Sequence, residues 1–412
     1  MNVVVLNTVL SNTGDAAIYQ AIVEALETEG IATPGEVSAL DSSARDTAVL
    51  YPNWNVLQQP TRSAARSKWS RRASNAWRRV LTGSLLRSRL LRTALKRAPL
   101  SSTSFARAVN AISSADLVLS SGGTYLVDHY NFRHRVQELE LARVMGKPIY
   151  LWTQSAGPFK DARARALIER LTPQLDGIFF RDERSRAAWS SISALPSSES
   201  VAPDCVFGLH DGSAQVPLQR DADSPLALIS VRSWGQGAEG GQLDFTAYRA
   251  AMRRIAVNLM SQGWRCVAVS TCQGVAGYNV DDANTARSIF DGLDVAIDSD
   301  FHTPDQLVQR IRSAQLVVAT RMHLAILSLI SQTPVIAIAY EPKSLELFRS
   351  LGRGDAVIEI EKTSENWADS LFVDGDVISH AAKLSLTELE ALSERARIPA
   401  RLIRDRLHAR IG

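Results

Sequence analysis

Along this chain, short runs of apolar residues alternate with segments in which apolar residues recur every three or four positions, as in an amphipathic helix. This alternation occurs in two series, one in each half of the chain. In the first series, residues 2–9, 37–40, 117–120, 148–153 and 177–180 have the composition of buried strands. Strands separated by helices pair in parallel, and helices then cover both faces of the sheet. The pattern therefore predicts an α/β fold built from Rossmann-like units.

The length of the chain and a break in the pattern divide it into two domains. A chain of 412 residues is too long for one ordinary hydrophobic core. We predict a Rossmann-like domain over residues 1–210, a linker over 211–225, and a second Rossmann-like domain over 226–375. Helices over 376–412 end the chain, and the two domains are expected to face a cleft.

Positive charge is concentrated in one stretch of the first domain. Residues 47–115 contain thirteen Lys and Arg but no Asp or Glu. Within them, residues 61–97 form a basic amphipathic helical insertion. Two alternatives fit it, namely contact with an anionic membrane surface or a helical pair packed on the domain with solvated arginines. The insertion lacks a nucleic-acid reader motif, so no nucleic-acid partner is expected.

Other features indicate a cytoplasmic protein. No run of about 18 apolar residues is present, and residues 1–6 resemble a first strand rather than a signal peptide. Cys205, Cys266 and Cys272 lack C-x-x-C spacing, so we expect reduced structural thiols. No compact set of zinc ligands occurs, and neither a metal nor another cofactor is expected.

Arg321 and His323 lie where an apolar strand gives way to a helix. Ligands of α/β proteins bind at the carboxyl ends of strands, and a helix amino terminus favours an anion. Arginine is a fixed cation for carboxylate or phosphate, and histidine transfers protons near neutral pH. We predict an anionic substrate and a proton-transfer step. The alternative is a helix-capping arginine and a histidine packed in the core.

Two further strand ends of the second domain carry cations. Arg232 follows the strand at 226–231, and Tyr340 and Lys343 follow the strand at 334–339. If the sheet is parallel, these residues share one edge with Arg321, which favours a common anion site. Taken singly, each has an ordinary alternative, a structural salt bridge for Arg232 and a surface position for Lys343.

The first domain offers residues suited to a hydroxylated ligand. Asn12, Gly14 and Asp15 follow the first strand, where Gly14 permits close approach of a ligand to the backbone. A simple turn with Asp15 as the helix cap is the alternative.

Another group follows the strand at 117–120. Gly122 and Gly123 end the strand, and polar side chains that are able to orient sugar hydroxyls or transfer a proton come next. These side chains are Tyr125, Asp128, His129 and His134. Each histidine has surface exposure or core packing as its alternative.

Taken together and in order, these motifs resemble the polysaccharide pyruvyl transferase family. The resemblance covers residues 2 to about 350. The motifs are Asn12-x-Gly14-Asp15, Ser121-Gly122-Gly123 with Asp128, Gln154 to Pro158, Arg181-Asp182-x-x-Ser185, Pro203-Asp204, Ser230-Val231-Arg232, Arg321-x-His323, and Pro334-Val335-Ile336 followed by Tyr340-x-x-Lys343. The basic insertion at 61–97 is a departure from the family core.

The resemblance implies a GT-B-like fold and transfer of pyruvate from phosphoenolpyruvate to two hydroxyls of a sugar in a cell-surface glycan or glycolipid, with phosphate released. The expected phosphoenolpyruvate ligands are Arg232, Arg321, Met322, His323, Tyr340 and Lys343. The expected acceptor ligands are Asn12, Gly14, Asp15, Gly122, Gly123, Tyr125, Asp128 and His134. The candidate catalytic residues are His323, Asp128 and Asp15.

Two other functions compete with this one, a GT-B glycosyltransferase that uses a nucleotide sugar and a non-catalytic glycan- or membrane-binding homologue. A glycosyltransferase would need acidic residues with E-x-x-E-like spacing after the Arg-x-His helix for the nucleotide ribose, and no pair with that spacing follows. A lipid-linked acceptor would bring the enzyme to the inner face of the plasma membrane, with residues 61–97 as the membrane contact.

Overall fold

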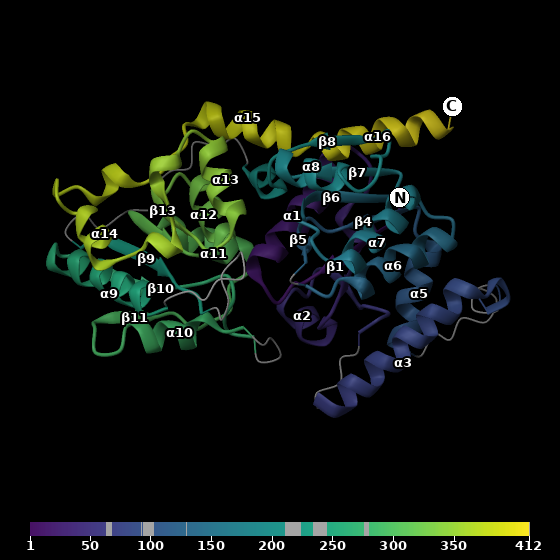
Figure 1. Ribbon diagram of the computed structural model, residues 1–412, viewed down its shortest axis with the longest axis horizontal. Helices are drawn as coiled ribbons and strands as arrows, with labels where there is room; N and C mark the ends of the chain where they lie inside the picture. The colour runs from purple at the N-terminus through teal and green to yellow at the C-terminus, as the bar shows by residue number, and fades with distance from the viewer. Residues whose placement is uncertain are drawn as a thin grey trace. The chain divides into compact units, whose positions relative to one another are not determined.

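The computed structural model describes residues 1–62, 68–91, 93, 103–128, 130–210, 224–233, 245–275 and 280–411 (Figure 1). Contacts divide the chain into two compact units. The first contains residues 1–11, 15–209 and 392–412, and the second contains residues 12–14 and 210–391. Most of the predicted linker, residues 211–223, lies outside the described residues.

The first unit is built on a parallel sheet with strand order β3-β2-β1-β4-β6-β7-β8, and β5 pairs with β6. The chain moves outward from β1 to β3 and then returns to place β4 on the other side of β1. Ligands of open α/β sheets bind at such a switch point. The strands are β1 (Val3–Thr8), β2 (Val37–Asp41), β3 (Asn55–Gln58), β4 (Leu117–Ser120), β5 (Gly123–Leu126), β6 (Ile149–Ala156), β7 (Gly177–Phe180) and β8 (Glu199–Val201).

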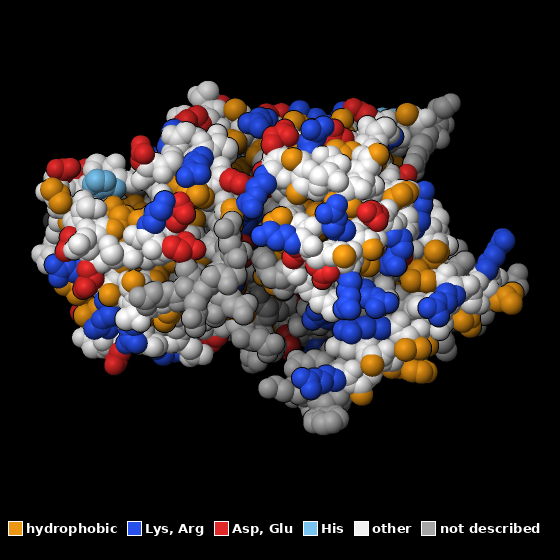
Figure 2. Space-filling view, in the orientation of Figure 1, with side chains coloured by type: hydrophobic (Ala, Val, Ile, Leu, Met, Phe, Trp, Pro, Cys, Tyr) orange, Lys and Arg blue, Asp and Glu red, His pale blue; other side chains and the backbone are white. Residues whose placement is uncertain are grey.

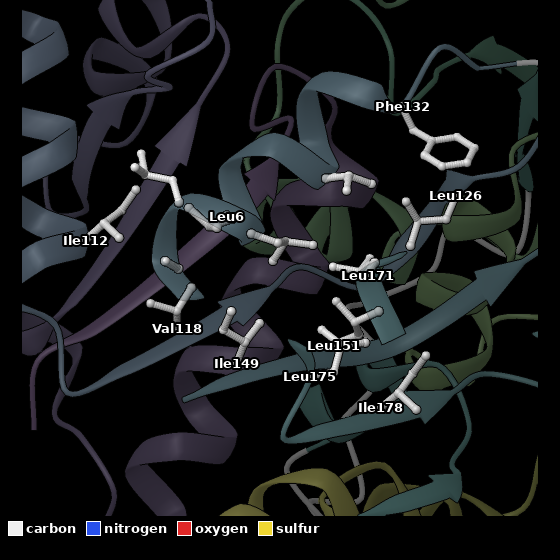
Figure 3. Close-up of a cluster of buried hydrophobic side chains, with 14 of the residues drawn as sticks. Leu6, Ile112, Val118, Leu126, Phe132, Ile149, Leu151, Leu171, Leu175 and Ile178 are labelled. Carbon is white, nitrogen blue, oxygen red and sulfur yellow. The ribbon is translucent and has the colours of Figure 1, made fainter. Parts of the chain in front are cut away.

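Helices cover this sheet and bury its strands, so that all eight residues of β6 are buried. Leu6, Val118 and Leu151 belong to the main hydrophobic cluster of the unit (Figure 3). The helices are α1 (Thr13–Thr28), α2 (Ala44–Leu50), α3 (Lys68–Arg87), α5 (Ser104–Ser114), α6 (Arg133–Val144), α7 (Ala162–Leu171), α8 (Glu183–Ser190) and α16 (Ile398–Ile411).

The second unit repeats the architecture with strand order β11-β10-β9-β12-β13-β14, again with parallel pairs. Its switch point lies between β9 and β12. The strands are β9 (Leu226–Ser230), β10 (Arg265–Ala268), β11 (Val295–Ile297), β12 (Leu316–Ala319), β13 (Val335–Ala339) and β14 (Val357–Glu359). The helices are α9 (Phe245–Ser261), α10 (Asp282–Ile289), α11 (Pro304–Arg312), α12 (Met322–Ile330), α13 (Pro342–Ser350), α14 (Glu365–Ser370) and α15 (Leu386–Ala396).

Short 3-10 helices complete the secondary structure. They are η1 (Pro34–Glu36), η2 (Thr172–Gln174), η3 (Cys205–Leu209), η4 (Gly354–Ala356), η5 (Ile360–Lys362) and η6 (Val377–His380).

The predicted Rossmann-like units and C-terminal helices are confirmed, whereas several short elements were not predicted. Among these, β3, β5 and β8 are only three or four residues long, too short for periodicity to indicate them. Residues 392–412, which include α16, group with the first unit. Within it, Arg401 and Arg404 pair with Glu29 of the region after α1 at 3.1 and 2.5 Å.

The basic insertion contains α3, which packs against α6 in the first unit. Leu85 is buried in the main cluster, and Arg78 donates a 2.6 Å hydrogen bond to Ser104 Oγ. Trp77 and Leu90, in contrast, are 62% and 83% exposed. The apolar side chains of the insertion therefore divide between the core and the surface. None of the described helices is long and apolar enough to cross a membrane.

Candidate active site

The carboxyl ends of β9, β12 and β13 lie side by side at one edge of the second sheet. β12 is paired with β9 on one side and with β13 on the other, and both pairs are parallel. Arg232 follows β9, Arg321 follows β12, and Tyr340 follows β13. The parallel arrangement required for a shared edge is therefore present, and it flanks the switch point of the unit.

Arg232 is the cation of this edge that lacks a carboxylate partner within the described part of the chain. Its guanidinium carbon lies 4.0 Å from the centroid of the Tyr340 ring, a cation–π contact. Its Nε is buried and has no hydrogen-bond partner among the described residues. Its backbone N–H donates to the hydroxyl of Tyr248 at 3.3 Å. A buried donor without a partner is costly, so this guanidinium is well suited to receive an anion.

Lys343 and Tyr340 have partners inside the unit. Lys343 Nζ lies 2.7 Å from Glu341 Oε2 and 6.0 Å from the centroid of the Tyr340 ring. Glu341 therefore compensates the charge of Lys343, which reduces its value as a third cation for an anionic substrate. The ring of Tyr340 supports the guanidinium of Arg232. The sequence predicted that the two residues share one edge of the sheet, but not that they are in contact.

Arg321 is held by an acidic residue that sequence reasoning missed. Its Nε and Nη2 each donate a 2.7 Å hydrogen bond to the carboxylate of Asp282, and Arg321 is only 8% exposed. Ser270 Oγ donates to the same carboxylate. Burial works against the charge of Arg321, but nearby Cys272 and Asp282 raise its pKa well above the ordinary value. The geometry favours a positioning role in which Arg321 joins the starts of α10 and α12.

His323 lies in the first turn of α12, and Met322 begins the helix. Met322 is 5% exposed and His323 is half-buried. Arg321 is the N-cap residue, and its side chain makes no capping hydrogen bond. Arg321 therefore occupies the N-cap position, but its side chain does not cap the helix, and the capping alternative is wrong in this respect. The free N–H groups and the positive end of the helix dipole favour an anion beside His323.

In the first unit, Gly122 and Gly123 are required by packing. A Cβ on Gly122 would lie 2.8 Å from Thr153 Oγ1, and Gly123 has a φ of +131°. Gly123 also begins β5, a strand that was not predicted from the sequence. These glycines allow the chain to lie against β6.

Asp128 and Tyr125 make defined contacts within the first unit. Asp128 Oδ2 accepts hydrogen bonds from the backbone N–H groups of Lys160 and, at 3.3 Å, Asp161. The guanidinium carbon of Arg135 lies 4.2 Å from the centroid of the Tyr125 ring. One oxygen of the Asp128 carboxylate thus holds a loop, and a role as a base would use its other oxygen.

The turn before α1 is capped by Asn12 rather than by Asp15. Asn12 Oδ1 accepts a 2.9 Å hydrogen bond from the backbone N–H of Gly14, as expected for a side chain at the N-cap position. Asp15 is half-buried in the first turn, where its negative charge is stabilised by the helix dipole. Asp15 therefore remains a candidate base.

His134 is a buried, neutral histidine. Arg62 Nη2 lies 3.2 Å from His134 Nε2. Burial, followed by the charges of Arg62, Arg135 and Arg79, lowers the pKa of His134 to about 3. It is therefore neutral at physiological pH and accepts a hydrogen bond from Arg62. His129 lies outside the described residues.

Three further family motifs meet at the carboxyl edge of β6, β7 and β8. The backbone N–H of Ala156 donates to Ser185 Oγ at 2.9 Å. Asp182 caps α8 by accepting from the backbone N–H of Ser185 at 2.7 Å. Arg181 and Asp204 form a buried ion pair at 3.1 Å. Residues matched to the family motifs therefore stabilise the edge of the sheet from within.

Both sheets, with their switch points, define an α/β protein of two Rossmann-like units with GT-B-like architecture. Over its whole length the chain is similar in fold to solved GT-B proteins. A UDP-N-acetylglucosamine 2-epimerase from Neisseria meningitidis matches with a TM-score of 0.55 and 11% identity, over 99% of this chain and 100% of that one. Sucrose-phosphate synthase from Thermosynechococcus elongatus matches with a TM-score of 0.52 and 14% identity, over 100% and 99%.

The chain belongs to the polysaccharide pyruvyl transferase family, whose model matches residues 12–342. The amylovoran biosynthesis protein AmsJ from Erwinia amylovora is 25% identical over 260 residues. That match covers 60% of this chain and 62% of AmsJ, so it spans less than two thirds of the relative. The family resemblance predicted from the motifs is confirmed.

Loss of one partner of the Arg321–Asp282 pair should strongly destabilise the second unit. Asp282→Asn leaves a buried guanidinium without its carboxylate, and we expect the free energy of unfolding to fall by about 3–5 kcal/mol. Denaturation by urea, followed by circular dichroism, measures the change. Replacing both partners with Asp282→Leu and Arg321→Met should restore most of it, because no unpaired charge remains.

The matched control is Asp291→Asn, which changes an exposed aspartate of the same unit and should alter stability by less than about 0.5 kcal/mol. Equal stabilities of Asp282→Asn and Asp291→Asn would show that the pair does not hold the two helix starts.

His134 should make the first unit sensitive to acid. The unfolded chain binds a proton at this histidine below its ordinary pKa, whereas the folded unit does not until the pH approaches about 3. The stabilisation is therefore complete above about pH 6.5 and is lost as the pH falls toward 3. Wild type should lose up to about 1.4 kcal/mol per pH unit more than His134→Gln across this range.

The effect of His134 must be measured as a difference between wild type and His134→Gln, because a buried carboxyl changes the pH dependence of stability in the opposite direction. Burial raises the pKa of Asp41 to about 6, which favours the folded state as the pH falls. Urea unfolding at a series of pH values measures both proteins, and parallel pH profiles would contradict the assignment of a neutral, buried His134.

Proposed function

We propose that the protein transfers pyruvate from phosphoenolpyruvate to two hydroxyls of a sugar, forming a cyclic ketal and releasing phosphate. Membership of the polysaccharide pyruvyl transferase family supports a transferase that modifies a glycan. The observation that carries the proposal is Arg232, a partly buried cation at the switch point of the second unit with no carboxylate partner among the described residues. Phosphoenolpyruvate bears both a phosphate and a carboxylate, and each group suits an arginine.

The reaction needs proton transfers in two directions. The methylene carbon of phosphoenolpyruvate gains a proton and becomes the methyl group, which leaves an oxocarbenium-like centre at C2. One sugar hydroxyl adds to C2 and loses its proton. The bond from C2 to the phosphate oxygen then breaks, and the second hydroxyl forms the second C–O bond while its proton leaves with phosphate. Acid–base catalysis by a positioned side chain contributes about 10²–10⁴-fold to such steps.

The second unit supplies residues for these roles. Arg232 binds the anionic donor, and the amino terminus of α12 offers N–H groups to the phosphate. His323, in the first turn of α12, transfers the proton to the methylene carbon. Arg321, paired with Asp282 at 2.7 Å, positions this turn, and its remaining N–H groups are available to the donor. Tyr340 supports Arg232 from the same edge of the sheet, and Lys343, which is paired with Glu341, lies beside it.

The first unit supplies candidates for the acceptor. Asp15 is half-buried in the first turn of α1 and is our choice for the base that activates a sugar hydroxyl. Asp128 keeps one carboxylate oxygen for this purpose, because the other accepts from the backbone of residues 160 and 161. Gly122 and Gly123 act through shape, since they fit the chain against β6.

Substitutions of Arg232 and His323 should reduce the reaction in different ways. Arg232→Gln removes a charged donor, and we expect kcat/KM for phosphoenolpyruvate to fall about 10- to 100-fold, mainly through KM. His323→Gln should lower kcat about 100-fold or more because proton transfer is lost. The measurement is phosphate release that depends on phosphoenolpyruvate and a glycan acceptor, together with the mass of the acceptor, which gains one pyruvate less one water.

Arg265→Gln is the matched control, since Arg265 is exposed at the beginning of β10, at the opposite edge of the same sheet. Its kinetic constants should equal those of wild type. Transfer from a nucleotide sugar without any use of phosphoenolpyruvate would replace our proposal with a glycosyltransferase.

We also propose that α3 and the residues after it bring the protein to an anionic membrane surface that carries the acceptor. Trp77, Val80 and Leu90 are 62%, 60% and 83% exposed. Figure 2 shows hydrophobic and basic side chains gathered over α3. Exposed apolar side chains among cations are typical of helices that lie in the membrane interface.

Removing the exposed apolar side chains should weaken membrane binding. We expect the double variant Trp77→Ala/Leu90→Ala to partition at least about tenfold more weakly onto vesicles that contain phosphatidylglycerol, because each side chain contributes about 1.5–3 kcal/mol on burial. Sedimentation with vesicles measures the partition. Val373→Ala is the control, since Val373 is a 77% exposed residue of the second unit. Equal pelleting of wild type and the double variant would exclude this surface.

A further inference from the structure

A cavity of about 540 Å³ lies in the first unit, beside α3 and α6. Four arginines and the neutral His134 are among its lining residues. Arg79 and Arg87 come from α3, Arg133 and His134 from the first turn of α6, and Arg62 from the segment before α3. Basic residues of the insertion thus meet those of α6 around one space.

No acidic side chain is among the described residues that line this cavity. The insertion cannot supply one, because residues 47–115 contain no Asp or Glu. In the described part of the chain, neither Arg79, Arg87 nor Arg133 forms a salt bridge with a carboxylate. The positive charge around the cavity is therefore uncompensated by its lining.

Two arginines of the lining, Arg62 and Arg79, act on each other electrostatically. Burial, followed by the charge of Arg135 and, more weakly, that of Arg79, lowers the pKa of Arg62, while Glu138 opposes the change. One oxygen of the buried Glu138 carboxylate, Oε1, accepts hydrogen bonds from the backbone N–H of Thr61, at 3.2 Å, and from its hydroxyl, whereas Oε2 has no hydrogen-bond partner among the described residues. Like charges held this close favour the binding of an anion.

We propose that this cavity binds the phosphate or diphosphate group of the acceptor substrate. Guanidinium groups match phosphate oxygens through paired hydrogen bonds. A ligand site commonly has a volume of roughly 300–1,000 Å³, so the cavity also accommodates a diphosphate with part of the attached sugar. The assignment of the phosphate to the acceptor rests on the pyruvyl transfer proposed above.

Two acceptors share this chemistry, a soluble sugar diphosphate and a sugar diphosphate on an isoprenoid lipid. Val80 lines the cavity and is also 60% exposed, so an apolar surface adjoins the cationic one. This continuity favours a lipid carrier.

The binding test uses the full chain and inorganic pyrophosphate, titrated by calorimetry in an Arg232→Gln background so that binding at the edge of the second sheet does not contribute. We expect Arg79→Gln/Arg133→Gln to raise the Kd at least about tenfold, because each arginine donates charge-assisted hydrogen bonds. Arg72→Gln is the matched control, since Arg72 is an exposed arginine of α3 outside the cavity. Its Kd should lie within about twofold of the parent value.

Absence of pyrophosphate binding, or an equal Kd in the double and control variants, would overturn the proposal. Arg79 and Arg133 are both exposed at the rim, and unchanged thermal unfolding of the double variant shows that the fold is retained. Arg87→Gln provides an independent variant with the same expected direction.

Competition identifies the source of the phosphate. Displacement of pyrophosphate by UDP-glucose supports a soluble sugar diphosphate, and displacement only by phosphatidylcholine vesicles containing an isoprenoid diphosphate supports a lipid carrier. Displacement by neither would overturn the assignment to an acceptor. None of these binding experiments requires phosphoenolpyruvate or turnover. A negative result for the cavity is therefore distinguishable from a negative result for pyruvyl transfer.

Discussion

The parallel pairing of short strands, with the central strands of each sheet fully buried, is the constraint on which the rest of this structure depends. Helices cover the sheets, and in these central strands polar side chains lie toward the carboxyl ends. A parallel sheet places every carboxyl end at the same edge, and a reversal of strand order opens a position there. In the second unit, Arg232 and the Arg321–His323 turn flank that reversal because β9 and β12 are neighbours. Sheet topology, rather than any local motif, creates the candidate site.

The two arginines at this edge differ because of what each one contacts. Arg321 is buried and forms a bidentate pair with Asp282, so much of its hydrogen-bonding capacity is used within the protein. A buried pair contributes little net stability compared with apolar packing, but loss of one partner is costly. The pair therefore fixes the starts of α10 and α12 firmly. Arg232 rests on an aromatic ring instead, which supports a guanidinium without neutralising its charge.

The sequence was sufficient to predict both sheets and the shared edge, because apolar strands and helical spacing are local signals. It could not reveal the partners. Asp282 lies 39 residues before Arg321, and only the folded chain brings β10 and β12 close to the same neighbour, β9. The division of α3 between Leu85 in the core and Trp77 at the surface was hidden for the same reason. From the sequence, His134 was a candidate for proton transfer. In the folded unit, burial and the charges of three arginines lower its pKa, which the sequence could not indicate.

The absence of acidic residues around α3 bears on what the first unit binds. Elsewhere in the first unit, two arginines have carboxylate partners, since Arg181 pairs with Asp204 and Arg186 pairs with Glu199. Around α3 the insertion itself supplies no such partner, since residues 47–115 contain neither Asp nor Glu. Concentrated positive charge destabilises a fold through self-repulsion and is relieved when an anion binds. A stretch of this length without one acidic residue is therefore better explained by a phosphate-bearing ligand or surface than by the stability of the unit alone.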